Sequence, residues 1–241
     1  MSLDSTDINK LTLWLKKINI ANANYYLANY TMSVPLLVKE NHTISINDTV
    51  VLKQNSKVSF PVLVHNAVSI YVQSKKQGNF DTFPIEIKEI LSAEDCDIVS
   101  FMGTVKKVKN IDVSNNKIED LAGLPECEYL DISFNPIKDF SLLKNNVSLK
   151  KLSLSLFHLD SKELISTLKD LLNSNVTSII IKDSFVRSKH REFGLSKDDV
   201  SVISNSVDYF LDRKRIESYV LKYDLEKMLP IHHNKKELLK F

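Results

Sequence analysis

The sequence predicts an α/β solenoid, in which short repeated coils stack and each adds one strand to a parallel sheet, with helical segments at both ends. Two observations carry this prediction. Segment 108–118 fits the pattern LxxLxLxxNxL, where L is any aliphatic residue, and segment 127–137 fits it again nineteen residues later. The LxL core of each segment is a short strand that sends alternate side chains inward and outward. One such unit cannot bury its apolar face alone, so neighbouring units have to stack.

The pattern continues on both sides of this pair. Toward the C-terminus the Asn position holds first Phe157 and then Ser184, and toward the N-terminus it holds Cys96. From residue 88 to 148 the repeats are 19 to 22 residues long, which leaves room for turns or 3₁₀ pieces between strands but not for a full helix. The additional units are 88–98, 149–159 and 176–186, with fainter matches at 67–72 and 50–55.

The pattern resembles the leucine-rich repeat, and the resemblance covers about residues 88–186. It implies a short solenoid with its parallel sheet on the concave edge, and a protein-binding module without catalytic activity. Because this family accepts Cys at the Asn position, the resemblance also implies a structural ladder of turn residues at Cys96, Asn116 and Asn135. Each Asn amide is expected to bond to backbone groups of its own coil and of the adjacent coil.

Three regions are expected along the chain. Residues 1–66 form an N-terminal helix, predicted over 5–18 from apolar residues at helical spacing, and a β-rich cap. Residues 67–186 hold the leucine-rich repeats, and residues 187–241 form a helical C-terminal cap with a basic tail. The ends of a solenoid need such covers because their apolar interior is otherwise open to water.

Two further helices are predicted. Asp160 and Glu163 have the spacing of a capping box, and leucines on one face follow them, so an outer helix is expected over 161–173. From Ser196 to Leu225 apolar residues recur at helical spacing, which predicts a second helical region, either continuous or broken near Asp212, that ends before Pro230.

Composition is that of an ordinary soluble protein. The 241 residues are 43% hydrophobic and 26% charged, and a net charge of +2 favours neither nucleic acid nor a membrane surface. No apolar run is long enough to span a bilayer, and the N-terminus lacks the layout of a signal peptide. The two cysteines fall on core-facing positions, so we expect reduced thiols in an intracellular, cytoplasmic protein of a host or virus-infected cell.

Motifs for catalysis or cofactor binding are not found. The four glycines are scattered, which excludes a phosphate-cradling loop, and His232-His233 has no partner residues at metal-ligand spacing. A Ser-His-Asp triad stays open, since its members need not be neighbours in sequence, but no nucleophile elbow supports one. We therefore expect no enzymatic activity, catalytic residue, cofactor or metal.

One basic loop is a possible nucleic-acid contact, through Arg187, Lys189 and Arg191. No aromatic residues interleave with these cations to stack on bases, so an ordinary solvated loop is favoured over nucleic-acid binding.

The repeats place variable residues in columns across the predicted sheet. One column brings Asp112 beside Asp131, and two like charges on adjacent strands favour a basic group from a partner between them. Exposed aromatic residues nearby would anchor such a partner. We therefore expect a protein that presents Lys or Arg to bind the concave face at Glu94, Asp95, Asp112, Tyr129, Asp131 and Phe134.

Two alternatives remain open. The face is a solvated surface without a partner, or the chain is a structural or accessory subunit of a larger assembly, such as a viral or phage particle or a polymerase complex. Such a subunit would dock through its caps and tail.

Overall fold

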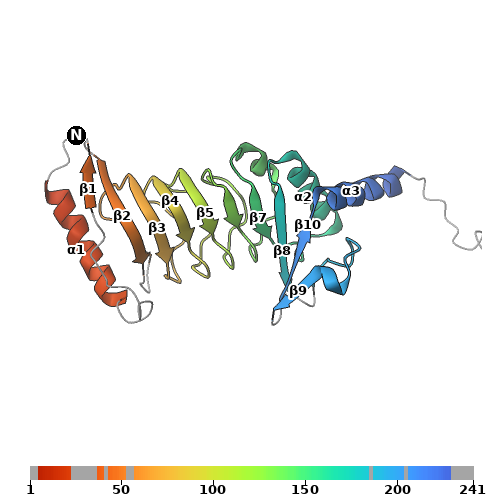
Figure 1. Ribbon diagram of the computed structural model, residues 1–241, viewed down its shortest axis with the longest axis horizontal. Helices are drawn as coiled ribbons and strands as arrows, with labels where there is room; N and C mark the ends of the chain where they lie inside the picture. Colours follow the sequence, from red (N-terminus) through yellow and green to blue (C-terminus); the bar gives the residue numbers. More distant parts are fainter. Residues whose placement is uncertain are drawn as a thin grey trace, which may run out of the picture.

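The computed structural model describes residues 5–22, 37–40, 43–52, 57–184, 187–203 and 206–228. These residues form a solenoid built on one ten-stranded sheet, with the strand order β1-β2-β3-β4-β5-β6-β7-β8-β10-β9. The strands from β2 to β8 are parallel, and the pairs at the two ends of the sheet are antiparallel. Figure 1 shows the strands side by side along the long axis, with α1 at one end and α3 at the other.

The strands are β1 Leu37–Glu40, β2 Thr43–Leu52, β3 Asn66–Val72, β4 Glu86–Ser92, β5 Lys107–Asp112, β6 Tyr129–Asp131, β7 Lys151–Leu154, β8 Ser178–Ser184, β9 Val200–Ile203 and β10 Ser206–Leu211. The helices are α1 Ser5–Asn22, α2 Ser161–Asn173 and α3 Arg213–Met228, with 3₁₀ turns η1 Ser141–Asn145 and η2 Lys197–Asp199. Between β4 and β7 the described chain contains turns and η1 but no α-helix, as the short repeats predict.

The strand register confirms the predicted stacking of the repeats. Leu130 pairs with Ile111 on one side and with Leu152 on the other. The fainter units belong to the same sheet, because Ile70 of β3 pairs with Val50 of β2. The repeat therefore continues in the structure up to β2, beyond the segment where its sequence pattern is clear.

The core lies between the sheet and the returning coils. Leu130 and Ile132, at the LxL positions of the best repeat, are 0% and 2% exposed, as predicted. The returning coils contribute buried Phe80, Phe101 and Phe140, which are separated in the sequence by about one and about two repeats. Their rings fill the interior. Each coil thus contributes apolar side chains from its strand and from its return segment.

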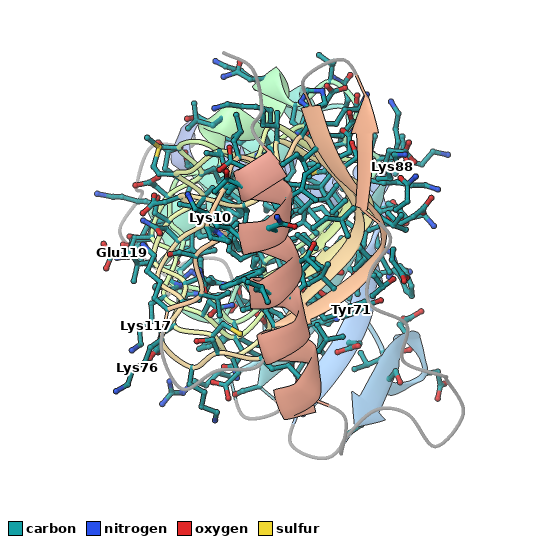
Figure 2. All side chains as sticks on the ribbon, turned by 90° about the vertical axis from the view of Figure 1, so that its left-hand side faces the viewer. Lys10, Tyr71, Lys76, Lys88, Lys117 and Glu119 are labelled. Atoms are coloured by element: carbon teal, nitrogen blue, oxygen red, sulfur yellow. The ribbon has the colours of Figure 1, made fainter. Side chains whose placement is uncertain are left out.

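Two predicted helices are confirmed. In α1, Leu11 and Leu15 are fully buried, and the Trp14 ring lies 4.8 Å from the Phe60 ring. Figure 2 shows α1 lying across the N-terminal end of the stack. In α2, the Asp160 carboxylate accepts the Glu163 N–H and the Glu163 carboxylate accepts the Asp160 N–H, which is the predicted capping box. None of the helices that the structure describes is long and apolar enough to cross a bilayer.

The helix predicted from Ser196 to Leu225 is wrong in its first half. Residues 200–203 and 206–211 are the antiparallel strands β9 and β10, and helix α3 begins only at Arg213. In β10 every second residue is buried, which is the period of a strand. Tertiary structure explains this difference. Strand β10 forms hydrogen bonds with the edge of β8, and that edge would stay unpaired if residues 206–211 formed a helix. The predicted basic tail lies outside the described residues.

Candidate functional site

One side of the sheet faces the core, and we call the other side the outer sheet face. Figure 2 shows Tyr71 and Lys88 on the strand side of the stack and Lys76, Lys117 and Glu119 on the coil side. Strand register places one residue from each of seven strands in a single row on the outer sheet face. This central row runs Tyr71, Ser92, Asp112, Asp131, Ser153, Ile180 and Phe210.

Asp131 lies at the centre of this row in a closed hydrogen-bond network. Its Oδ1 accepts the N–H of Ser133 at 3.0 Å and the Ser133 hydroxyl. Its Oδ2 accepts the Tyr129 hydroxyl at 3.2 Å and Nζ of Lys182 at 2.6 Å. With a side chain only 3% exposed, Asp131 is a buried carboxylate with its charge already paired.

Lys182 therefore lies beside Asp131, where the sequence predicts a Lys or Arg from a partner. Burial disfavours its charge, but the hydrogen bond and the charge of Asp131 outweigh burial and raise the pKa of Lys182. The prediction that Asp131 pairs with a partner's Lys or Arg needs correction, since its carboxylate is occupied within the chain. The expected adjacency of Asp112 and Asp131 is confirmed by the register of β5 and β6.

Tyr129 bridges the network, because its hydroxyl also lies 3.1 Å from the Ser153 hydroxyl. Burial raises the pKa of Tyr129, so it keeps its proton at neutral pH. Neither protonated Tyr129 nor charged Lys182 can act as a base toward Ser153, which is fully buried. These side chains connect strands β6, β7 and β8 through hydrogen bonds in the middle of the outer sheet face.

Two other carboxylates predicted for this face, Asp112 and Glu94, are open to a partner, and Asp208 of β10, in register with Lys182, is a further carboxylate on the face that the prediction omitted. Asp112 is half-buried, and its Oδ1 accepts the N–H and the hydroxyl of Ser114 at 3.0 and 2.8 Å. Glu94 is exposed in the turn after β4. Within the part of the chain that the structure describes, neither Asp112 nor Glu94 forms an ion pair, whereas Asp95 pairs with Lys75 at 2.8 Å.

Sequence reasoning missed Phe210, the residue that ends the central row. Its side chain is 65% exposed and lies beside the half-buried Ile180 on the neighbouring strand. The missed signal is the alternation of SVDYFL, which the spacing of aliphatic residues over 196–211 obscured. Phe210 adds an exposed aromatic residue to the outer sheet face.

Phe134 occupies the first turn after β6, at the same repeat position as Asp95 and Asn115. All three residues have left-handed backbones, with φ of 57°, 52° and 57° respectively. Phe134 is half-buried, and its ring lies 6.5 Å from the Phe157 ring. The expected aromatic residue is thus at the end of the strand, beside the outer sheet face.

The predicted Asn ladder is confirmed. Oδ1 of Asn116 accepts the N–H groups of Cys96 and Ile98 from the preceding coil, both at 2.9 Å. Its Nδ2 donates to three carbonyls, among them Ala93 of the preceding coil and Val113 of its own coil.

Asn135 repeats this arrangement one coil later. Its Oδ1 accepts the Ile118 N–H at 3.0 Å, and its Nδ2 donates to the carbonyls of Val113 and Ile132. Cys96 joins the ladder through its thiol, which donates to the Val72 and Glu94 carbonyls. These side chains bind successive turns together through groups that the turns leave without backbone partners.

The ladder ends on a residue that the sequence pattern misplaced. Asp183, and not Ser184, accepts the N–H groups of Leu156 and Phe157. Its other oxygen accepts the Tyr209 hydroxyl at 3.2 Å, which ties β10 to the repeats. Burial raises the pKa of Asp183, although these hydrogen bonds oppose the shift.

Both cysteines are buried free thiols in the structure. Burial raises the pKa of Cys96 to about 11 and that of Cys127 to about 12. They therefore remain protonated at neutral pH and are poor nucleophiles.

The basic loop after β8 lies at the C-terminal end of the sheet. Arg187 and Arg191 are exposed, while the side chain of Lys189 is 15% exposed and lies 3.9 Å from Glu192. Phe193 of this loop is turned inward. The described residues 187–196 thus present separate cations without an exposed stacking platform.

One Ser-His contact occurs in this loop. His190 Nδ1 lies 2.9 Å from the Ser188 hydroxyl. The Asp183 carboxylate bonds instead to Tyr209 and to backbone N–H groups, and among the described residues no hydrogen bond joins it to the imidazole. The contact lacks the carboxylate that orients the base of a triad. The described residues contain no group of three or more His, Cys, Asp or Glu side chains that could hold a metal ion.

Comparisons with protein families, with curated proteins and with solved structures find no match. The functional argument therefore starts from the geometry of the outer sheet face.

Proposed function

We propose that this chain is a leucine-rich-repeat module without catalytic activity, and that it binds a partner protein on the outer sheet face. The observation that supports this proposal is the central row. Strand register brings Tyr71, Asp112 and Phe210 into one row, although they come from three distant parts of the sequence. Aromatic side chains on the same face as an unpaired charge are typical of protein-binding surfaces.

Within this surface, Asp112 is the carboxylate that a partner's Lys or Arg would meet, because it forms no ion pair among the described residues. Glu94 and Asp95 would contribute at the turn after β4, and Tyr129 would contribute the exposed part of its ring. Asp131 acts indirectly, by fixing Tyr129 and Lys182.

Rigidity supports the same proposal. The Asn ladder and the Asp131 network hold the strands in one arrangement before any partner arrives. A preorganised surface loses less conformational entropy on binding and so binds more tightly for a given set of contacts. Under this proposal α1 and the C-terminal elements are caps, and the protein acts in the cytoplasm of a host or virus-infected cell.

The test uses the full-length chain. A tagged protein would capture partners from extract of the native host, and a captured protein would be purified and titrated by calorimetry against three chains. These are the unaltered chain, Asp112→Lys, and a chain with Arg187, Lys189 and Arg191 all changed to Ala.

Asp112→Lys should weaken binding at least about tenfold, because it places two cations together at the contact. The triple variant should bind normally and should show no change in salt dependence. Loss of binding in the triple variant, with Asp112→Lys unaffected, would move the interface to the basic loop. Circular dichroism would check that both variants are folded.

A second candidate function is that of a subunit that docks through its C-terminal end. Val202 of β9 and Leu221 of α3 are apolar and more than half exposed, and both lie at this end. If this docking dominates, Val202→Lys with Leu221→Lys would abolish capture while Asp112→Lys leaves it intact.

A further inference from the structure

Phe134 stands at a position that the two preceding coils fill with small polar residues, and that Leu156 occupies in the following coil. Asp95 and Asn115 occupy the equivalent turns, and all three residues have a φ between 52° and 57°. Asp and Asn adopt this left-handed conformation readily because their short side chains can hydrogen-bond locally. A phenylalanine gains no such bond, so its backbone is strained there.

The ring is not fully buried. Phe134 is half-buried, and among the described aromatic rings its close neighbour is Phe157, with 6.5 Å between the ring centroids. Its hydrogen bond is made by the backbone N–H, which donates to the Ser155 hydroxyl at 2.8 Å. Asn or Asp at this position would make the same bond. Strained backbone positions cluster at functional sites.

The neighbouring aromatic residue is held in place. The Phe157 ring lies edge-on to the His158 ring at 5.6 Å, and His158 Nε2 donates to the Ile137 carbonyl at 2.7 Å. Phe157 is also half-buried. Phe134 and Phe157 therefore present two adjacent, partly exposed rings, which we call the aromatic pair.

We infer that the aromatic pair binds a large apolar side chain of the partner, and that Phe134 is retained at a strained turn for this purpose. This inference rests on the proposed function and specifies the chemistry of the partner. Asp112 pairs with Asp131 across β5 and β6, and Phe134 lies three residues beyond Asp131. The Cα atoms of Asp112 and Phe134 are thus at most roughly 16 Å apart, from the spacing of adjacent strands and the reach of three residues of chain.

A partner that contacts both residues presents a Lys or Arg to Asp112 and a large apolar side chain to Phe134. This limit corresponds to at most about five residues of an extended polyproline II segment or about eleven residues of a helix. Charge complementarity favours the cation, since Asp112 and exposed Glu94 form no ion pair among the described residues. The occupant is therefore a segment of a partner protein that is both basic and apolar.

The experiment has two independent measurements. The first is thermal unfolding of Phe134→Asn, with Asn115→Asp as a matched control at the same turn position one coil away. Removing strain without removing a core contact should raise the melting temperature of Phe134→Asn by about 2–4 °C, while the control stays unchanged. A lower melting temperature would mean that the ring stabilises the fold by packing, and would overturn the inference.

The second measurement is selection of phage-displayed random peptides of about 16 residues on the immobilised full-length chain, a length that covers both spacings. Peptides with Lys or Arg and a large apolar residue no farther apart than these spacings should be enriched. Binding of their synthetic versions should fall at least about tenfold on Phe134→Asn and on Asp112→Lys.

The outcomes separate the two proposals. Peptides that need Asp112 but bind Phe134→Asn normally would overturn the role of the aromatic pair and leave the binding surface standing. Peptides that need neither residue would overturn the role of the outer sheet face itself. A more stable Phe134→Asn that has lost peptide binding would support both.

Discussion

Lys182 Nζ lies 2.6 Å from Asp131 Oδ2, although 51 residues separate the two in the sequence. The ion pair reaches from β8 past β7 to β6 and lies over Ser153 on the intervening strand. The ion pair neutralises the Asp131 carboxylate, which is almost completely buried. The pair thus links β6 to β8 across the outer sheet face, while the neighbouring Asp112 forms no ion pair among the described residues.

Breaking this pair should destabilise the fold. Lys182→Met keeps most of the apolar stem but leaves the Asp131 charge unpaired, and it should lower the free energy of unfolding by about 3 kcal/mol. The measurement is urea denaturation at pH 7. The double variant Asp131→Asn with Lys182→Met should recover part of the loss, because no buried charge remains. An equal loss in the double variant would show that charge burial is not the cause.

Leu130 should be among the most sensitive core positions. Its side chain is fully buried and faces the interior of the best repeat. Leu130→Ala should lower the free energy of unfolding by about 2–5 kcal/mol through lost burial and the cavity left behind. Denaturant titration would measure this, with exposed Leu63→Ala as the control. A loss below about 1 kcal/mol would contradict the packing described here.

Asn116 should matter for its hydrogen bonds and not for its packing. Asn116→Ala leaves buried N–H groups of Cys96 and Ile98 without an acceptor. The expected loss is about 1–3 kcal/mol or more, since each unmade buried bond has a cost of this order. The exposed neighbour Glu119, changed to Ala, should have almost no effect in the same thermal and urea unfolding experiments. Similar losses for both variants would argue against the ladder.

Asp183 should make stability depend on pH. Its folded-state pKa is raised above the ordinary value of 3.8 by burial, so the folded chain holds this proton more tightly than the unfolded chain. Its contribution to stability is therefore largest at low pH and falls as pH rises from the unfolded pKa through the folded pKa.

Asp183→Asn keeps an oxygen acceptor for Leu156 and Phe157 but carries no charge. It should stabilise the chain relative to the parent at pH 7, and this advantage should disappear near pH 3, where Asp183 is protonated. Urea unfolding across this range measures the difference. An advantage of the same size at every pH would exclude the raised pKa as its cause.

Much of the candidate surface could be predicted from spacing alone. The template placed Asp112 beside Asp131, and the register of β5 and β6 confirms this pair. It succeeded because a parallel solenoid converts a fixed period in the sequence into fixed neighbours in the sheet. The pattern could not show whether those neighbours were already bonded to a third residue.

The sequence by itself determined the repeat, its strands, the Asn116 and Asn135 ladder and the helix that starts at Ser161. Each of these follows from local period, from a capping pair or from a turn residue, so a short window of sequence contains the cause. Only the tertiary structure decided that residues 206–211 form a strand, that Asp183 ends the ladder and that Lys182 neutralises Asp131. The physical reason is the same in all three cases: the deciding energy comes from an open strand edge, unpaired backbone groups or a buried charge on another part of the chain.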